Sequence, residues 1–246
     1  MKGKKAIRWL LTVLLVAVLG YCLYNIYLIS MEFIEMDRQI EAVQGQYTVD
    51  TSSDENDNSD KFEIKWQQLL ETNKDVIGWI YIPNTKISYP VVQGKNNEMY
   101  LKQGIDGKYA KTGTIFADSS NLNPFFDFNT VIYGHNLMNN SSMFSELAKY
   151  KKQSFADEHQ MIYIYLPDNS CLKYKVVSFH KVDALSTGVY DTTVPDKQNF
   201  ISSMKSGNKL EWRFDDNDIS SVITLSTCTN VKENERYILH AVMVDA

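Results

Sequence analysis

The stretch Ile223-Thr224-Leu225-Ser226-Thr227-Cys228 alternates apolar and small polar residues, as a half-buried β-strand does. A polar segment, Thr229–Glu235, leads into a second run with strand character, Arg236-Tyr237-Ile238-Leu239-His240. If the two strands pair antiparallel, Cys228 and Arg236 lie at the same end of neighbouring strands, within side-chain reach. A cation there favours the thiolate or stabilises a developing oxyanion. The pair predicts cysteine chemistry, and a small buried hydrophobe is the alternative role for this cysteine.

Short runs with strand character continue back through the chain, and few helices separate them. The runs are Gly78–Pro83, Ile87–Val92, Gly113–Ala117, Thr130–Tyr133, Met161–Leu166, Cys171–Val182, Ser221–Cys228 and Arg236–Val244. About eight short strands predict a mainly β fold that is closed or sandwiched. Helices are expected from Phe62 to the polar cluster Asn73-Lys74-Asp75, over Met143–Lys149 and over Gln198–Met204.

The N-terminus has the pattern of a single membrane span. Residues 1–8 carry four basic side chains, and an almost unbroken apolar run extends from Trp9 to Ile29. About 20 apolar residues cross a bilayer and the basic side stays cytoplasmic, so the chain after Ile29 is expected outside the cell membrane. A cleaved signal peptide is the alternative, but its apolar core is shorter and Leu28–Met31 offers no small-x-small cleavage site.

Residues 30–60 are expected to connect this span to the folded part. Apolar residues recur at helical spacing from Met31 to Val43, which predicts a helical stalk. Gln44–Asp60 then loses nearly all apolar content and collects acidic residues, which predicts a linker. The folded domain is expected over residues 61–246.

Composition excludes several classes of protein. With 11 Gly and 5 Pro in 246 residues, the chain is neither collagen-like nor of low complexity, and a net charge of −5 lacks the basic footprint of nucleic-acid binding. The cysteines Cys22, Cys171 and Cys228 are odd in number and widely spaced, so they build neither a disulfide framework nor a zinc-type pair.

A cysteine nucleophile needs a group that exchanges protons, and the chain has four histidines. His159 lies in a polar stretch and is expected to be solvated. His180 alternates with apolar residues and is expected to face the core. His240 shares the strand face of Arg236 but lies about 13 Å further along at 3.3 Å per residue, so it is expected to pack beneath the sheet.

His135 differs from the other three because it leaves an apolar strand directly after Gly134. A scaffold displays working residues at such strand-to-loop exits, and glycine permits a tight backbone there. We therefore expect His135, Cys228 and Arg236 to form the catalytic constellation.

At these residues the chain resembles a known family. Thr224-Leu225-Ser226-Thr227-Cys228 followed by Arg236 is similar to the cysteine signature of sortases, and Val131-Ile132-Tyr133-Gly134-His135-Asn136 is similar to their histidine segment. Two further stretches, Asp75–Ile87 and Tyr89–Gly94, resemble the class B branch. The resemblance covers essentially the whole folded region. It implies an eight-stranded sortase-type β-barrel with an N-terminal helical region and short helices in the connections.

The resemblance also implies an activity, that of a cysteine transpeptidase of Gram-positive cell surfaces. Such an enzyme cleaves a C-terminal sorting signal of surface proteins after its Thr and passes the acyl group to a peptidoglycan-precursor amine. Cys228 is then the nucleophile, Arg236 binds the oxyanion or the substrate backbone, and His135 moves the protons. No metal or other cofactor is implied.

The resemblance further implies five residues that line a peptide groove. These are Asn97, Leu101, Ser186, Tyr190 and Ser226. Some class B members carry an acid after the cysteine, whereas this chain has Thr229-Asn230, so no Cys-His-Asp triad is implied.

Two other functions stay open at this point. A papain-like cell-wall cysteine hydrolase places its cysteine at a helix N-terminus ahead of its histidine in the sequence. A non-catalytic extracytoplasmic binding module keeps Cys228 in its core.

Overall fold

The structure is a computed structural model that describes residues 2–50, 62–137, 142–185 and 188–245. Contacts divide the chain into two compact units, Met1–Ala42 and Val43–Ala246. Each unit is described by itself.

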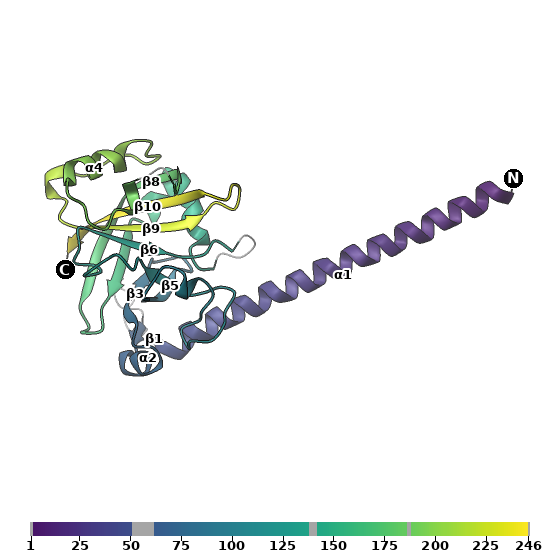
Figure 1. The fold of residues 1–246 in the computed structure, drawn as a ribbon, viewed down its shortest axis with the longest axis horizontal. Helices are drawn as coiled ribbons and strands as arrows, with labels where there is room; N and C mark the ends of the chain where they lie inside the picture. The colour runs from purple at the N-terminus through teal and green to yellow at the C-terminus, as the bar shows by residue number, and fades with distance from the viewer. Residues whose placement is uncertain (1, 51–61, 138–141, 186–187, 246) are drawn as a thin grey trace. The chain divides into compact units, whose positions relative to one another are not determined.

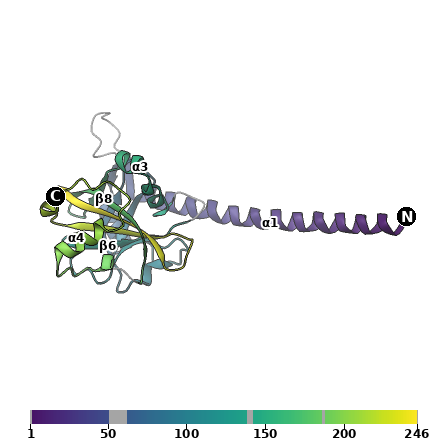
Figure 2. The same cartoon turned by 90° about the horizontal axis from the view of Figure 1, so that it is seen from above.

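The first unit is helical and belongs to α1 (Lys2–Tyr47), which Figures 1 and 2 show as one unbroken helix. The predicted span lies inside it, and apolar side chains such as Leu15 and Tyr21 are exposed. From Ile7 onward the helix is long and apolar enough to cross a membrane. It therefore fits the single-pass anchor expected for residues 9–29.

The connection between the helix and the barrel differs from the expected linker. α1 continues to Tyr47, and β1 (Thr48–Asp50) pairs antiparallel with β2 (Phe62–Ile64). The helix expected to begin at Phe62 is the shorter α2 (Trp66–Thr72). The apolar spacing of residues 62, 64 and 66 fits a strand as well as a helix, and the distant partner strand decides between them.

The second unit contains a closed barrel of eight strands, which confirms the predicted fold. Its strands are β3 (Val76–Tyr81), β4 (Ser88–Val92), β5 (Ile115–Ala117), β6 (Asn129–Tyr133), β7 (Met161–Tyr165), β8 (Cys171–Asp183), β9 (Val222–Cys228) and β10 (Glu235–Asp245). The order around the barrel is β10-β8-β7-β3-β4-β5-β6-β9. The pairs β4/β5 and β6/β9 are parallel, and the other neighbours are antiparallel. Closure leaves the barrel without a free edge.

Short helices lie in the connections between strands. They are η1 (Met99–Leu101), η2 (Ser145–Lys151), α3 (Gln153–Glu158), η3 (Gly188–Tyr190), α4 (Lys197–Lys205) and η4 (Asp216–Asp218). The helix expected over Met143–Lys149 is the 3-10 helix η2, and α3 after it was not predicted. The helix expected over Gln198–Met204 is α4, capped by the Asp196 side chain, which accepts from Asn199 N.

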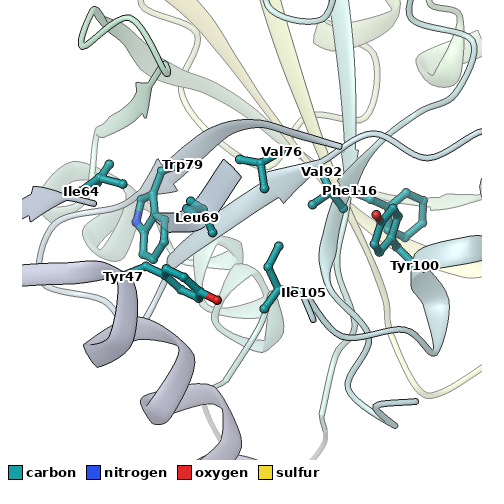
Figure 3. Close-up of a cluster of buried hydrophobic side chains, with 9 residues drawn as sticks. All are labelled: Tyr47, Ile64, Leu69, Val76, Trp79, Val92, Tyr100, Ile105 and Phe116. Atoms are coloured by element: carbon teal, nitrogen blue, oxygen red, sulfur yellow. The ribbon is translucent and has the colours of Figure 1, made fainter. Parts of the chain in front are cut away.

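A cluster of large buried side chains fixes the connection that carries η1. Figure 3 shows nine of its members, among them Trp79 and Tyr100. Tyr100 is buried, and its hydroxyl donates to Asp75 Oδ2 over 2.8 Å and accepts from Asn73 Nδ2 over 2.9 Å. Burial raises the pKa of Tyr100 to about 12, so it remains a neutral donor. This anchor holds the neighbouring residue, Leu101, in place.

Candidate active site

The parallel neighbours β6 and β9 bring the histidine and the cysteine together. Figure 1 shows these strands side by side, and in their register Tyr133 lies opposite Ser226. Because parallel strands end at the same edge, His135 just beyond β6 lies near Cys228, the last residue of β9. Two hydrogen bonds continue the pairing past the strands, from Thr227 Oγ1 to Gly134 O over 2.7 Å and from Asn136 Nδ2 to Cys228 O over 2.7 Å.

Gly134 is required where the chain passes from β6 to His135. A Cβ atom at this position would lie 2.5 Å from Ile115 Cδ1 and 2.7 Å from Phe144 Cδ2. Real Cβ atoms do not approach other heavy atoms this closely, so any other residue here would force these side chains or the Gly134 backbone to shift. Gly134 thus serves close side-chain packing beside His135, and its φ does not lie in the left-handed region that favours glycine.

The antiparallel pair β9/β10 places Cys228 directly opposite Arg236. Side chains of directly opposed residues point to the same face of the sheet. Arg236 Nη1 donates to the carbonyl oxygens of Glu233 over 2.7 Å and Glu235 over 3.1 Å, so the β9–β10 loop holds the guanidinium. The thiol and the guanidinium thus meet at one end of the barrel, as the sequence pattern predicts.

A pocket of about 380 Å³ lies at this end. Its lining residues are Asn97, Leu101, Phe116, Tyr133, Gly134, His135, Ala184, Tyr190, Ser226, Thr227, Cys228 and Arg236. Seven of the eight site residues expected from the sequence are among them. The eighth, Ser186, lies outside the described residues.

His135 is held by the main chain of η1. Its Nε2 lies 2.8 Å from the carbonyl oxygen of Leu101. A carbonyl only accepts, so Nε2 carries a hydrogen in this arrangement and Nδ1 is the ring nitrogen that can exchange a proton with a substrate. Among the described residues, no carboxylate contacts this ring.

Glu235 ends the loop that follows Cys228, and its carboxylate binds residues other than His135. Its carboxylate lies 3.0 Å from Lys181 Nζ and accepts from Thr229 Oγ1 over 2.9 Å. The hydrogen bond from Lys181 lowers the pKa of the Glu235 carboxyl. This residue is therefore a structural acid at the base of the loop.

The other histidines lie away from the pocket. His240 is fully buried, its Nδ1 lies 2.7 Å from Ser178 Oγ, and burial holds its pKa well below the ordinary value. His180 is buried as predicted, with Nε2 2.6 Å from Met204 O. His159, expected to be solvated, is partly exposed, and its ring stacks on Phe155 with ring centroids 4.0 Å apart.

Two tyrosines form one wall of the pocket, and one of them, Tyr133, is not predicted as a site residue from the sequence pattern. Its ring stacks on Tyr190, with centroids 5.9 Å apart. Tyr190 OH lies 2.9 Å from Ser226 Oγ, and Tyr133 OH donates to Asp118 Oδ2 over 2.7 Å. Burial raises the pKa of both tyrosines, so both hydroxyls stay neutral. Tyr133 lies on β6 and Tyr190 on η3, so residues far apart in the sequence form this wall and no local motif predicts it.

Two observations on the described residues bear on the chemistry of this site. Within residues 2–50, 62–137, 142–185 and 188–245, no group of three or more His, Cys, Asp or Glu side chains is arranged to hold a metal ion. Cys228 ends a β-strand rather than beginning a helix, and its histidine precedes it in the sequence. These features contradict a papain-like hydrolase.

The chain matches a known protein family over most of its length. A sortase-domain family profile matches residues 80–244 of this chain. The chain belongs to the sortase family. It is 30% identical to sortase B of Listeria monocytogenes over 230 residues, which are 91% of each chain. It is also 29% identical to sortase B of Staphylococcus aureus over 232 residues, covering 93% of this chain and 91% of the other.

The fold agrees with the same branch of the family. The crystal structure of Staphylococcus aureus sortase B matches with a TM-score of 0.66 and 27% sequence identity, over 74% of this chain and 88% of that chain. The present sortase is thus of class B, a cysteine transpeptidase, and the hypothesis of a non-catalytic binding module is wrong.

Proposed function

We propose that this sortase is anchored in the cell membrane by α1 and joins surface proteins to a cell-wall precursor. It cleaves a C-terminal sorting signal through a thioacyl intermediate on Cys228 and transfers the acyl group to an amine. The observation that carries the proposal is the convergence of Cys228, His135 and Arg236 on one pocket. A nucleophile, a proton carrier and a fixed cation are the groups that this acyl transfer requires.

In the first half of the reaction, the Cys228 thiolate attacks the carbonyl carbon of the substrate Thr. The sulfur–carbon bond forms, the peptide C–N bond breaks, and His135 gives its proton to the departing amine. Arg236 hydrogen-bonds to the oxygen that becomes negative in the tetrahedral intermediate. Its side chain suits this task because the loop carbonyls of Glu233 and Glu235 already orient the guanidinium.

In the second half, an amine attacks the thioester carbonyl. It passes a proton to His135, and Cys228 leaves as a thiolate. The wall of Tyr133 and Tyr190, together with the neighbouring lining residue Phe116, shields the thioester, which favours a bound amine over water. This shielding supports transfer over hydrolysis.

The substrate peptide is proposed to lie along the other pocket residues. Asn97, Leu101, Tyr190 and Ser226 line the pocket together with the nucleophile. A Staphylococcus aureus sortase B with 28% identity over 74% of this chain has been solved as a substrate complex, which supports a substrate of the same class. The membrane part of the proposal rests on α1 and its basic end, which favours a cytoplasmic N-terminus.

The proposal is tested with the full-length protein in detergent and a panel of fluorogenic peptides with Thr before the scissile bond. We expect cleavage of at least one peptide, a faster turnover when a short amine acceptor is added, and a new ligated product. Cleavage that yields only the hydrolysed acid, whatever amine is offered, would contradict transpeptidation. Cys228→Ala serves as the inactive reference.

A further inference from the structure

We propose that Asp118 is a positioning residue for substrate recognition, acting through Asn97 and Tyr133 without contacting the substrate. The inference rests on the proposed function, because it assumes that a peptide occupies the pocket. Asp118 follows β5 directly and is only 6% exposed. It does not line the pocket, whereas Asn97 and Tyr133 do.

The Asp118 carboxylate accepts three hydrogen bonds. Ser120 N donates to Oδ1 over 2.8 Å, and Oδ2 accepts from Asn97 Nδ2 over 2.9 Å and from Tyr133 OH over 2.7 Å. The main chain of Asp118 is also fixed, because its N–H donates to Val131 O over 2.8 Å. A carboxylate this firmly held orients the groups that donate to it.

The two bonds of the Asn97 side chain determine which way its amide points. Its Oδ1 accepts from Ser119 N over 2.8 Å, and its Nδ2 donates to Asp118. A backbone N–H only donates and a carboxylate only accepts, so a flipped amide would lose both bonds. One Nδ2 hydrogen is therefore used by Asp118, and the second is the donor that the amide can offer to a ligand.

This arrangement defines the group that Asn97 recognises. A donor fixed at the pocket wall selects a carbonyl oxygen, from the peptide main chain or from a side-chain amide, and rejects an N–H in the same place. Without Asp118 the amide can turn and present its oxygen instead. Asp118 thus determines that Asn97 presents a hydrogen-bond donor, and not an acceptor, to the ligand.

The same carboxylate also steadies the aromatic wall. Tyr133 donates to Asp118, and its ring stacks on Tyr190, whose hydroxyl lies 2.9 Å from Ser226 Oγ. Asp118 therefore links the η1 side of the pocket, which carries Asn97, to the wall beside the nucleophile. Both sides must hold their shape for a peptide to bind in one register.

The test is a double-mutant cycle between Asp118→Asn and Asn97→Ala in the full-length protein. The substrate is the fluorogenic peptide that the wild type cleaves fastest. We expect D118N to raise KM about tenfold, the order of one lost hydrogen bond to a charged group, and to leave kcat within about twofold. In the N97A background D118N should change KM less than about threefold, because the partner is already gone.

Two readouts separate positioning from general damage. A charged methanethiosulfonate reagent should modify Cys228 at the same rate in D118N and wild type. The matched control is Asp127→Asn, since Asp127 accepts from Asn121 Nδ2 over 2.9 Å and from Asn123 N over 3.1 Å outside the pocket. It should leave KM unchanged. If the increases in KM caused by D118N and by N97A multiply in the double variant, the inference is overturned. The same rise in KM in the D127N variant would also overturn it.

If D118N does not fold, the exchange variant N97D/D118N keeps an amide–carboxylate pair at these positions. It should fold and retain kcat with a raised KM, because the donor amide has moved out of the pocket wall. A wild-type KM in this variant would overturn the inference. A wild-type enzyme that cleaves no peptide contradicts the proposed function itself, and a cleaving enzyme with an ineffective D118N contradicts only the role of Asp118.

Discussion

Cys228 and Arg236 are direct partners across the antiparallel strands β9 and β10, at the end of the barrel where the pocket lies. Their separation is set by the pairing of two strands and not by a flexible loop. Both side chains therefore line the same pocket before any substrate binds. Such preorganisation lowers the reorganisation needed in the transition state.

Arg236→Lys tests whether this cation acts through directed hydrogen bonds. Lysine keeps the charge but lacks the planar fork of donors, so we expect kcat/KM for peptide cleavage to fall at least tenfold. Arg213→Lys is the matched control, since Arg213 pairs with Asp157 and Glu211 on the surface and should be replaceable. Near-wild-type kcat/KM in the Arg236 variant would leave only a thiolate-stabilising charge.

His135→Asn tests the proton carrier. The reaction needs a group that gives a proton to the departing amine and later takes one from the attacking amine, and this role is proposed for His135. Asparagine cannot exchange a proton in this way, so we expect kcat to fall roughly a hundredfold or more while peptide binding persists. The measurement is the cleavage rate from pH 5 to 10, with His159→Asn as the control. An unaltered profile in the His135 variant would assign the proton transfer to another base.

Gly134→Ala tests the local packing that aims His135. The added Cβ collides with the side chains of Ile115 and Phe144, so we expect a loss of about 1–3 kcal/mol in the free energy of unfolding and a large loss of activity. Gly45→Ala is the control, because a Cβ there meets nothing within 4 Å. Equal activity and stability of the Gly134 variant and wild type would show that the side chains of Ile115 and Phe144 can shift to make room for the added Cβ atom.

His240→Gln tests the buried histidine beneath the barrel wall. Burial lowers the His240 pKa in the folded protein, so the unfolded chain binds the proton first as pH falls below about 6.5. The free energy of unfolding should therefore be highest above that pH. Below it, this free energy should decline by up to about 1.4 kcal/mol per pH unit for each such proton. Burial lowers the pKa of His180 in the same direction. In His240→Gln the free energy of unfolding by urea should depend less steeply on pH between 5 and 6.5, and an unchanged slope would contradict the account.

The sequence predicts those parts of the fold that have a local signal. Alternation located the barrel strands, and the strand-to-loop exit at Gly134 together with the resemblance to sortases located His135. Non-local pairing is what escaped prediction. Phe62 and Ile64 form a strand only because Thr48–Asp50 lies opposite them.

The candidate site likewise contains contacts that a local sequence signal predicts and contacts that it does not. Cys228 and Arg236 are eight positions apart and joined by one loop, so their meeting followed from strand pairing. Tyr133 meets Asp118 and Tyr190 through contacts between distant parts of the chain, and no spacing along the sequence encodes these contacts.

The covalent intermediate gives the most direct test of the central claim, that Cys228 carries the acyl group. The full-length protein is mixed with an intact peptide that the wild type cleaves, and the reaction is quenched in acid. The intact mass of the protein is then measured. We predict an added mass equal to the acyl part of the peptide in wild type and in Cys171→Ala, and none in Cys228→Ala, which also loses turnover while keeping its thermal stability. An adduct that persists in Cys228→Ala, or equal loss of turnover in both cysteine variants, would contradict the account.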